Sequence, residues 1–268
     1  MISRQIGRLF SWWRDGLARG LVRIGLEPNH VTVVGMLLTV GAGVAVAAGR
    51  AYWWPWAVSL LVAAGACDLL DGAMARIGDR YSRFGSILDS VCDRISDAAL
   101  YAGSLFYLAL FPDDLGRGGR PNLTLMVLAA MGLMWAYLTS YVRARAKNEG
   151  IRAGGGFWQR PERMVTILLG LAFYHFTTAI WILGILPATT VAHRLWRVRR
   201  CCAAGAEGGD RAADGVEPRG PLGILLWRWP RGGWPFDLYA GTIIAMLVFW
   251  RVPPADPLAA LVAWLVRP

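Results

Sequence analysis

The sequence predicts an all-helical integral membrane protein, built as a bundle of six transmembrane helices with an amphipathic helix before it and a hydrophobic extension after it. Hydrophobic residues make up 56% of the 268 residues and charged residues only 17%, which is more apolar side chain than a soluble core of this length uses. Several apolar runs approach or exceed the roughly 20 residues that a spanning helix needs. Basic residues are frequent in every second segment between these runs, as in multi-pass membrane proteins.

Residues 1–26 are predicted to form an amphipathic helix that lies in the membrane interface. Their apolar residues recur at helical spacing, while Arg8, Asp15 and Arg19 fall on the opposite face. No continuous apolar core and no small-residue cleavage site follows the first basic residues, so we do not expect a removable signal peptide.

Six spanning helices are expected between residues 27 and 200. The first four are predicted at residues 31–48, 53–70, 88–111 and 123–142. The apolar run from Arg163 to about residue 190 is short for two complete spans of roughly 20 residues each. We therefore expect a hairpin there, made of a stubby fifth helix, a turn near residues 175–178 and a sixth helix.

The distribution of basic residues predicts the orientation of the bundle. Lys and Arg gather before the first span, between the second and third, and after the fourth, whereas only Arg50 separates the first span from the second. The positive-inside rule places the basic segments in the cytoplasm, so the expected location is the inner cell membrane with these segments facing inward. Helix ends near anionic headgroups also account for the formal charge of +10, so we expect no nucleic-acid partner.

The chain after residue 200 is predicted to be an extension of the membrane domain. Residues 201–235 are rich in Gly, Ala and charge and are predicted to be a linker. Residues 236–268 form a hydrophobic C-terminal segment, in which 236–252 is a further candidate membrane helix and 257–266 is too short to span. Because the motif described below is complete before the extension, we expect a chain that ends near Arg200 to remain active.

Four aspartates at the end of the second predicted span and the start of the third form the most informative motif. Asp68 and Asp71 are three residues apart, so they share one face of a helix. Asp89 and Asp93 are four apart and also share a face. Acidic side chains at membrane depth are costly and usually functional. If the two helices pack side by side, the four carboxylates converge and require a compensating cation, for which Mg²⁺ or Mn²⁺ is the natural partner.

Small and basic residues beside these acids suit a bound phosphate. Gly72 and Ala75 leave the helix surface bare, so that a flat base or a pyrophosphate can approach the backbone. Arg76 lies one turn past Gly72 and can neutralise a phosphate. Gly85 allows the third helix to begin close to the second.

The complete pattern is Asp-x2-Asp-Gly-x2-Ala-Arg-x8-Gly-x3-Asp-x3-Asp. It matches the signature of the CDP-alcohol phosphotransferase family at every specified position, and the chain therefore resembles this family. The resemblance extends from the N-terminal helix, through Pro28-Asn29-His-Val-Thr32, to about Arg200. It implies a six-helix bundle, usually a homodimer, with two metal ions and a CDP-lipid that enters from the cytoplasmic leaflet.

The resemblance also implies a role for each signature residue. Asp68, Asp71 and Asp89 are implied to bind metal. Asp93 is implied to contact metal and to act as the general base. The implied reaction transfers a phosphatidyl group from CDP-diacylglycerol to a small alcohol and releases CMP. The residues implied to hold the CDP-lipid are Thr32, Gly72, Ala75, Arg76 and Gly85.

A second polar cluster, after the fourth predicted span, suits a phosphorylated acceptor. The strings Ser-Tyr-Val-Arg-Ala-Arg at 140–145 and Gly-Gly-Phe-x-x-Arg-Pro-Glu-Arg at 155–163 place donors at the cytoplasmic mouth, where they match a doubly charged phosphate monoester. Both strings resemble the phosphatidylinositol-phosphate synthases of actinobacterial type. That resemblance implies that the phosphate of inositol 1-phosphate is bound by Ser140, Arg143, Arg160, Arg163 and Arg194.

Alternatives to this function remain open from the sequence alone. The same metal site could serve another acceptor, such as glycerol 3-phosphate, serine, or an inositol phosphate with a CDP-inositol donor. Arg160 and Arg163 could be positive-inside anchors instead of phosphate ligands. From a different class, the chain could be a transporter whose intramembrane acids form an ion path. Release of CMP from a CDP-lipid separates an enzyme from a transporter.

Overall fold

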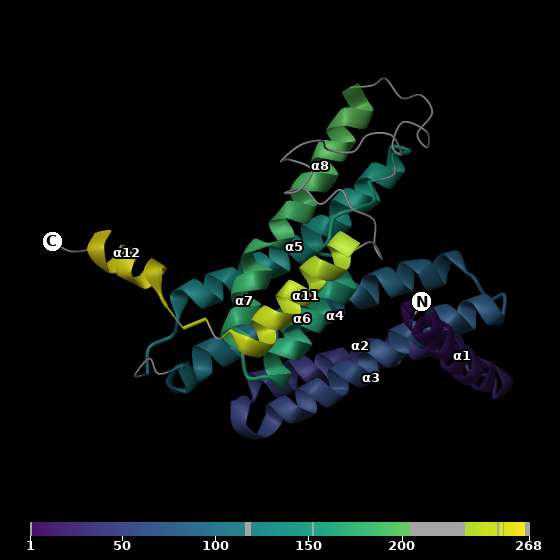
Figure 1. Ribbon diagram of the computed structural model, residues 1–268, viewed down its shortest axis with the longest axis horizontal. Coiled ribbons are helices and arrows are strands. Elements are labelled where there is room, and N and C mark those ends of the chain that lie inside the picture. Colours follow the sequence, from purple (N-terminus) through teal and green to yellow (C-terminus); the bar gives the residue numbers. More distant parts are fainter. Residues whose placement is uncertain are drawn as a thin grey trace. The chain divides into compact units, whose positions relative to one another are not determined.

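The computed structural model describes residues 2–115, 119–151, 153–203, 234–250, 252–253 and 255–265, without the side chains of 2–11, 50, 51, 115 and 234. Within this part of the chain all regular structure is helical, which confirms the predicted class (Figure 1). The chain divides into two compact units, Met1–Ser104 and Leu105–Pro268. The helix α4 begins in the first unit and ends in the second.

The first unit contains one amphipathic helix and three long helices. They are α1 (Ile2–Arg23), α2 (Pro28–Ala47), α3 (Arg50–Ile77) and α4 (Arg83–Leu110). Pro28 stands in the first turn of α2, where its missing N–H costs no hydrogen bond. Gly49, just before α3, has a φ of 111° that favours glycine.

The helix α1 packs on α2 and α3 through a small apolar cluster. Ala18 of α1 is buried together with Val31, Ala73 and Met74, and Leu21 of α1 packs against the same group. Trp12 and Trp13 are exposed. The predicted helix over residues 1–26 is therefore present, while its location in a membrane interface remains a prediction.

Helices α2 and α4 cross at glycines. A Cβ on Gly103 of α4 would collide with the backbone of Gly43 in α2, and a Cβ on Gly43 would collide with the carbonyl group of Ala99. Side-chain-free positions such as these let two helix backbones approach closely in a membrane protein. This contact fixes α4, and with it the two aspartates on its first turns, against α2.

The second unit contains the remaining helices of the described residues. They are η1 (Pro112–Leu115), α5 (Leu123–Asn148), α6 (Arg160–Ala172), α7 (Phe176–Ile185), α8 (Pro187–Ala203), α11 (Trp234–Phe249) and α12 (Pro257–Leu265). Glycines again permit close packing, since a Cβ on Gly170 would lie 2.5 Å from the Ala179 Cβ. The Trp135 indole N–H donates to the Gly184 carbonyl at 2.8 Å and joins α5 to α7.

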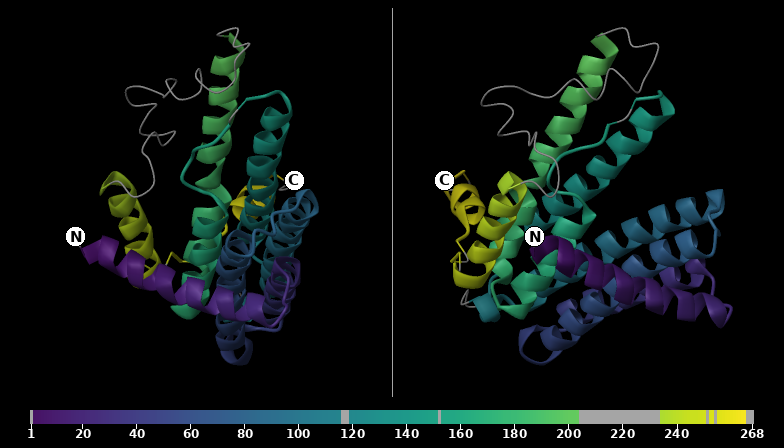
Figure 2. Two further views of the ribbon diagram at one scale, coloured as in Figure 1. Left: turned by 90° about the vertical axis from the view of Figure 1, so that its right-hand side faces the viewer. Right: turned by 45° about the vertical axis from the view of Figure 1, so that its right-hand side comes forward.

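The described part of the extension packs on the helices that precede it. The helix α11 lies against α6 and α7, in yellow beside green and teal in Figure 2. Just past the end of α11, the Thr178 hydroxyl donates to the Trp250 carbonyl at 3.0 Å and accepts from the Val252 N–H at 2.9 Å. His175 Nδ1 donates to the Leu247 carbonyl at 2.8 Å.

Asp256 of the extension caps the N-terminus of α5. Its carboxylate accepts hydrogen bonds from the backbone N–H groups of Leu123 and Thr124 at 3.1 and 3.0 Å, and from the Thr124 hydroxyl at 2.7 Å. The first N–H groups of a helix have no partner within the helix, so a carboxylate placed there satisfies them and also interacts favourably with the helix dipole.

Four described helices are long and apolar enough to cross a membrane. They are Pro28–Ala47, Tyr52–Ile77, Leu123–Asn148 and Phe176–Ala203, with a shorter apolar helix at Pro235–Phe249. These spans support an integral membrane protein, but the predicted number of six is not established. The helix α4 has 28 residues but includes the acidic motif, and α6 has only 13 residues, as the predicted stubby helix requires.

In place of the predicted hairpin the structure has the short helix α6 and then α7 and α8, which together form one apolar span, Phe176–Ala203; the break between them lies at residues 173–175, slightly earlier than expected. Of the predicted linker, residues 201–203 complete α8 and residues 234–235 begin α11, while 204–233 lie outside the described residues. The predicted boundary at residue 200 remains a prediction.

Candidate active site

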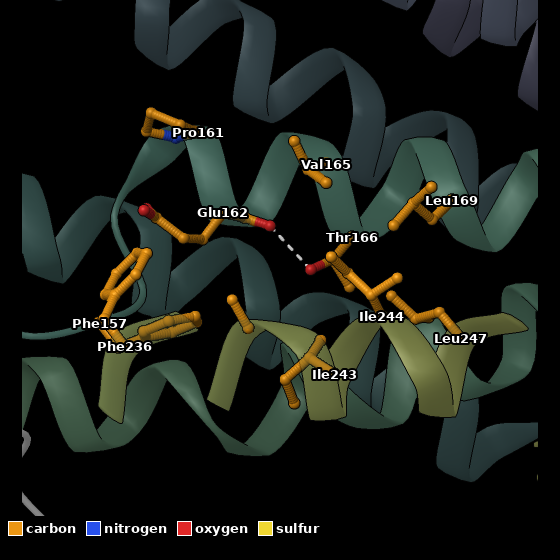
Figure 3. Close-up of a pocket in the computed structure, with 11 residues that line it drawn as sticks. Phe157, Pro161, Glu162, Val165, Thr166, Leu169, Phe236, Ile243, Ile244 and Leu247 are labelled. Atoms are coloured by element: carbon orange, nitrogen blue, oxygen red, sulfur yellow. Dashed lines mark hydrogen bonds between the residues drawn. The ribbon is translucent and has the colours of Figure 1, made fainter. Parts of the chain in front are cut away.

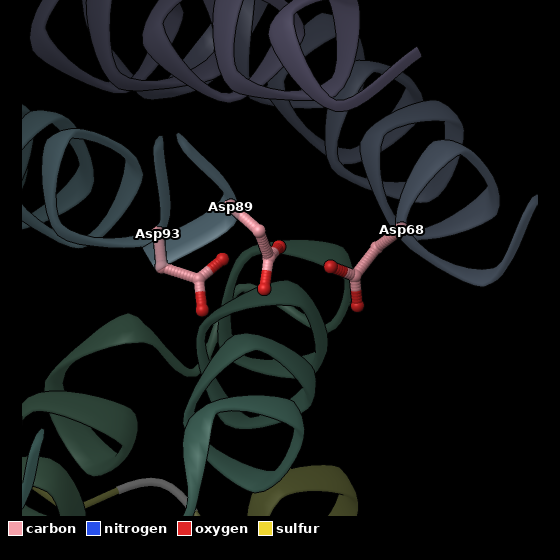
Figure 4. A group of neighbouring side chains, drawn as sticks. All are labelled: Asp68, Asp89 and Asp93. Atoms are coloured by element: carbon pink, nitrogen blue, oxygen red, sulfur yellow. The ribbon is translucent and has the colours of Figure 1, made fainter. Parts of the chain in front are cut away.

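Three of the four predicted metal ligands converge in the first unit. Asp68 on α3 and Asp89 and Asp93 on α4 each offer one carboxylate oxygen within 4.8 Å of the others (Figure 4). Asp68 and Asp89 are exposed and Asp93 is half-buried, so an ion can reach the group. Three converging carboxylates repel one another and are hard oxygen donors. They therefore fit a divalent ion such as Mg²⁺ or Mn²⁺.

A tight turn between α3 and α4 produces this arrangement. The Gly78 N–H donates to the Met74 carbonyl at 2.9 Å and the Arg80 N–H to the Ala75 carbonyl at 3.1 Å, which closes the end of α3. Asp79 then takes a φ of 48°, a conformation that Asp tolerates better than most residues. The chain turns within five residues, and the acidic faces of the two helices meet.

Asp71, the fourth predicted ligand, is engaged differently. Its Oδ2 accepts a hydrogen bond from the Thr32 hydroxyl at 2.6 Å, and its Oδ1 accepts from the Gly72 N–H at 2.5 Å. These contacts tie α3 to α2 and fix the orientation of the carboxylate. A carboxylate oxygen has two lone pairs, so the contacts are compatible with metal ligation, which remains a prediction for Asp71.

A pocket of about 360 Å³ adjoins the carboxylates and is lined by α2, α3, α4 and the turn. Four of the five predicted CDP-lipid residues line it, namely Thr32, Gly72, Ala75 and Gly85. Arg76 is not part of the lining, but its Nη1 lies 3.6 Å from the position that a Cβ on Gly72 would occupy. The guanidinium group therefore lies beside the bare backbone at Gly72.

The pocket also includes residues that the sequence did not single out as ligands. Asn29 comes from α2, and Arg80, Tyr81 and Ser82 come from the turn. The turn residues fall in the eight-residue gap that the signature leaves unspecified, so no spacing could identify them. A Cβ on Gly85 would lie 2.9 Å from both Asn29 Oδ1 and Ser82 Oγ, which explains the need for glycine there.

The predicted acceptor cluster lies in the second unit, and its members differ in exposure. Arg143 on α5 is exposed, and Arg160 and Ser140 are half-buried. Arg194 on α8 is 3% exposed and Arg163 on α6 is 2% exposed. Both buried arginines contact the loop between α5 and α6.

Arg163 and Arg194 donate their hydrogen bonds to backbone carbonyl groups. Arg194 Nε donates to the Gly155 carbonyl at 3.3 Å, and its Nη1 donates to the Thr139 carbonyl, next to Ser140. Arg163 Nη1 donates to the Trp158 carbonyl at 3.5 Å. The structure thus brings Arg194, Ser140 and the glycine-rich loop together, and gives both buried arginines a role in holding the loop.

The CDP-alcohol phosphatidyltransferase family profile matches residues 26–196 of the chain. The chain belongs to this family. The match covers α2 to α7 and most of α8, and so it includes both the carboxylate group and the arginine cluster. The helices α11 and α12 lie outside it.

Relatives within the CDP-alcohol phosphatidyltransferases agree with this assignment. The chain is 36% identical over 207 residues to the phosphatidylinositol phosphate synthase of Mycobacteroides abscessus, which covers 74% of this chain and 88% of the relative. It is 35% identical over 199 residues to the phosphatidylinositol phosphate synthase of Mycobacterium tuberculosis, covering 68% and 83%.

Crystal structures of the Mycobacterium tuberculosis phosphatidylinositol phosphate synthase are similar to this fold. The form with CDP-DAG bound has a TM-score of 0.59 at 31% identity, over 69% of this chain and 92% of that one. The form in complex with manganese and citrate has a TM-score of 0.60 at 28% identity, over 79% and 98%.

Proposed function

We propose that this protein transfers a phosphatidyl group from CDP-diacylglycerol to inositol 1-phosphate, with release of CMP and formation of phosphatidylinositol phosphate. The main support is the convergence of Asp68, Asp89 and Asp93 beside a pocket lined by signature residues. The relatives named phosphatidylinositol phosphate synthase, one of them with CDP-DAG bound, support the donor and the acceptor.

The carboxylates are proposed to hold divalent metal. Asp68, Asp89 and Asp93 supply oxygen ligands and Asp71, oriented by Thr32, supplies a fourth. When bound, the metal stabilises the negative charge that develops on the departing CMP. The relative in complex with manganese supports a divalent ion. We propose two ions, of Mg²⁺ or Mn²⁺, for each site.

The residues of the chain itself bind the donor and move the proton. The bare backbone at Gly72 and Ala75 admits the pyrophosphate, and Arg76 neutralises part of its charge. Asp93 accepts the proton of the acceptor hydroxyl while the hydroxyl oxygen forms a bond to the lipid-side phosphorus. The bond from that phosphorus to the bridging oxygen breaks, and CMP leaves with the bonding electrons.

The acceptor phosphate is proposed to bind Ser140, Arg143, Arg160, Arg163 and Arg194. Arginine carries five N–H donors, so the observed hydrogen bonds of Arg163 and Arg194 to carbonyl groups are compatible with a hydrogen bond to phosphate. The same contacts hold the guanidinium groups in fixed positions. Fixed donors favour a phosphate monoester over a neutral alcohol.

The proposed setting is a homodimer in the inner membrane, with six spanning helices in each subunit and the active site facing the cytoplasm. The length of α4 and the sequence of short α6 before α7 and α8 support six spans. The basic segments between the spans support the orientation. The exposed tryptophans of α1 support its place in the interface.

An acceptor panel tests this function. Purified protein in lipid nanodiscs is given CDP-diacylglycerol and Mg²⁺, with inositol 1-phosphate, free inositol, glycerol 3-phosphate or serine, and both CMP and the lipid product are measured. We expect the highest kcat/KM with inositol 1-phosphate. Preference for another acceptor would refute the acceptor but not the transferase, and absence of CMP with all four would favour a transporter.

A further inference from the structure

The extension helix α11 contacts the loop that leads into the acceptor arginines. Phe157 of this loop is 4% exposed. Its ring lies 4.6 Å from that of Tyr239, centroid to centroid, at an interplanar angle of 86°, and 5.0 Å from that of Phe236. Tyr239 also lies 6.5 Å from the ring of Trp158. Edge-to-face aromatic pairs at such distances are favourable beyond the area they bury.

Figure 3 shows where this aromatic contact lies. An apolar groove of about 190 Å³ runs between α6 and α11, and Phe157 and Phe236 stand together at the end of it that is nearest to Pro161 and Glu162. That end is the N-terminus of α6, where Arg160 and Arg163 are found. The rest of the groove is lined mostly by aliphatic side chains of α6 and α11.

Side chains of α8 bind the backbone of the same loop. The Trp158 N–H donates to the Thr190 hydroxyl at 3.0 Å, and Arg197 donates to the Gly154 carbonyl at 2.9 Å. Gly156 has a φ of 85°, and a Cβ there would collide with Thr190. The backbone of the loop is therefore bound by α8, whereas the ring of Phe157 is bound by α11.

A shift of the loop affects the proposed phosphate ligands directly. Arg163 donates to the Trp158 carbonyl, and the Gln159 N–H donates to the Glu162 carboxylate at 3.2 Å in the first turn of α6. Phe157 immediately precedes these groups. Loss of its aromatic contacts would loosen the loop and change the positions of the guanidinium groups on α6.

We infer that Tyr239, assisted by Phe236, is a positioning residue for the acceptor site: it holds Phe157, and through the loop it sets the arginines that bind the acceptor phosphate. The inference rests on the proposed function. It assigns a role in the reaction to α11, which lies beyond the residues 26–196 that match the family.

The test uses the full-length protein and four variants. Tyr239→Ala removes the ring, Tyr239→Phe keeps it, and Tyr239→Leu keeps most of its volume. Ile243→Ala is the matched control, because Ile243 is buried one turn further along α11 and lines the groove. The measurements are kcat, the KM for inositol 1-phosphate and for CDP-diacylglycerol, the melting temperature, and hydrogen exchange of residues 154–159.

We expect Tyr239→Ala and Tyr239→Leu to raise the KM for inositol 1-phosphate by about two- to tenfold, the loss expected for an aromatic contact. The donor KM should stay unchanged and the loop amides should exchange faster. Tyr239→Phe keeps the ring but loses the hydroxyl that pairs with Trp158, so it should stay closer to the parent than Tyr239→Ala does. Ile243→Ala should lower the melting temperature without changing the acceptor KM.

Two results would overturn the inference. One is an unchanged acceptor KM and unchanged loop exchange in Tyr239→Leu, and the other is an equal rise in acceptor KM in Ile243→Ala. If the parent protein does not use inositol 1-phosphate, the proposed acceptor is wrong. In that case hydrogen exchange of residues 154–159 still tests whether Tyr239 holds the loop. Equal exchange in Tyr239→Leu and in the parent would refute that role.

Discussion

The four signature aspartates occupy different surroundings, and this difference predicts different roles. Asp68, Asp89 and Asp93 present oxygens to one another within 4.8 Å. Asp71 instead receives hydrogen bonds on both oxygens, from the Thr32 hydroxyl and the Gly72 N–H. Asp71 is thus oriented by hydrogen bonds of the protein, whereas the other three are arranged as we propose for metal ligands.

Asparagine substitutions should separate the base from a ligand. We expect Asp93→Asn to lower kcat by about 10²- to 10⁴-fold, the usual contribution of a general base, while retaining CDP-lipid binding better than Asp68→Asn does. Asp68→Asn should weaken donor binding as well, because a metal ligand acts in the ground state and in the transition state. Donor dissociation constants and single-turnover rates measure both effects. Equal losses of donor binding in the two variants would refute this division of roles.

Arg143 offers the cleanest test of the acceptor cluster at the level of one side chain. Arg163 is less suitable, because it is 2% exposed and donates to the Trp158 carbonyl, so its removal also affects folding. We expect Arg143→Ala to raise the KM for inositol 1-phosphate by roughly ten- to a hundredfold, the effect of a hydrogen bond to a charged group.

Arg145→Ala is the control for Arg143→Ala, because Arg145 is also exposed on α5 and pairs with Glu149 at 2.7 Å. Its acceptor KM should stay within about twofold of the parent value, since exposed ion pairs contribute little. Steady-state kinetics with each substrate varied in turn provides the comparison. Equal KM values in the parent and in Arg143→Ala would remove Arg143 from the acceptor site.

The convergence of three signature aspartates could be predicted from the sequence, whereas other residues of the site could not. Spacing identified Asp68, Asp89 and Asp93 because helical periodicity fixes which side chains share a face. It could not identify Arg80 in the turn, because the signature leaves the turn unspecified. Nor could it show that Arg194 donates to the Gly155 carbonyl, since partners distant in sequence leave no local pattern.

At the level of helices, the crossing of α2 and α4 should be intolerant of added volume. A Cβ on Gly103 would collide with the Gly43 backbone. We expect Gly103→Ala to destabilise the protein by about 1–3 kcal/mol, as overpacking of a tight contact does. Gly65→Ala in α3 is the control, because a Cβ there has open space. Thermal unfolding in detergent compares them, and equal melting temperatures would contradict the close crossing.

Asp256 should make the attachment of the extension dependent on pH. Burial tends to raise the pKa of Asp256, but hydrogen bonds from Thr124, Ala259 and Leu123 outweigh it and hold this pKa below its ordinary value of 3.8. A lowered carboxylate pKa contributes stability that is present above the ordinary pKa and is lost as the pH falls through the lowered one.

Asp256→Asn removes the charge but keeps an acceptor oxygen, so it should be less stable than the parent near neutral pH by about 0.3–1 kcal/mol, the interaction of a carboxylate with the helix dipole. The difference should shrink once the pH falls below about 4. Melting temperatures of parent and variant across this pH range provide the measurement. A difference that stays constant down to low pH would show that the carboxylate charge is not involved.

Helix positions were predicted closely, whereas contacts of the extension were not. The predicted spans at residues 31–48 and 123–142 correspond to α2 and α5, because long apolar runs mark such helices directly. The cap of Asp256 on Thr124 joins residues that are 132 positions apart. No local periodicity encodes a contact of that kind.

For the molecule as a whole, composition and apolar run length predicted the all-helical membrane class, and the described helices confirm it. Six spans and a homodimer remain predictions. The sequence predicts that a chain ending near Arg200 remains active, but the contacts of α11 with the loop before α6 alter this expectation. A chain ending near Arg200 is now expected to keep donor binding and to lose affinity for the acceptor.

Release of CMP tests the central claim most directly. Purified full-length protein is incubated with CDP-diacylglycerol and inositol 1-phosphate in the presence of Mg²⁺ or Mn²⁺, and again with excess EDTA. The carboxylate site predicts CMP and phosphatidylinositol phosphate in equal amounts with metal, none with chelator, and recovery when metal is restored. Full turnover in excess EDTA would contradict the metal site, and no CMP under any of these conditions would contradict the transferase.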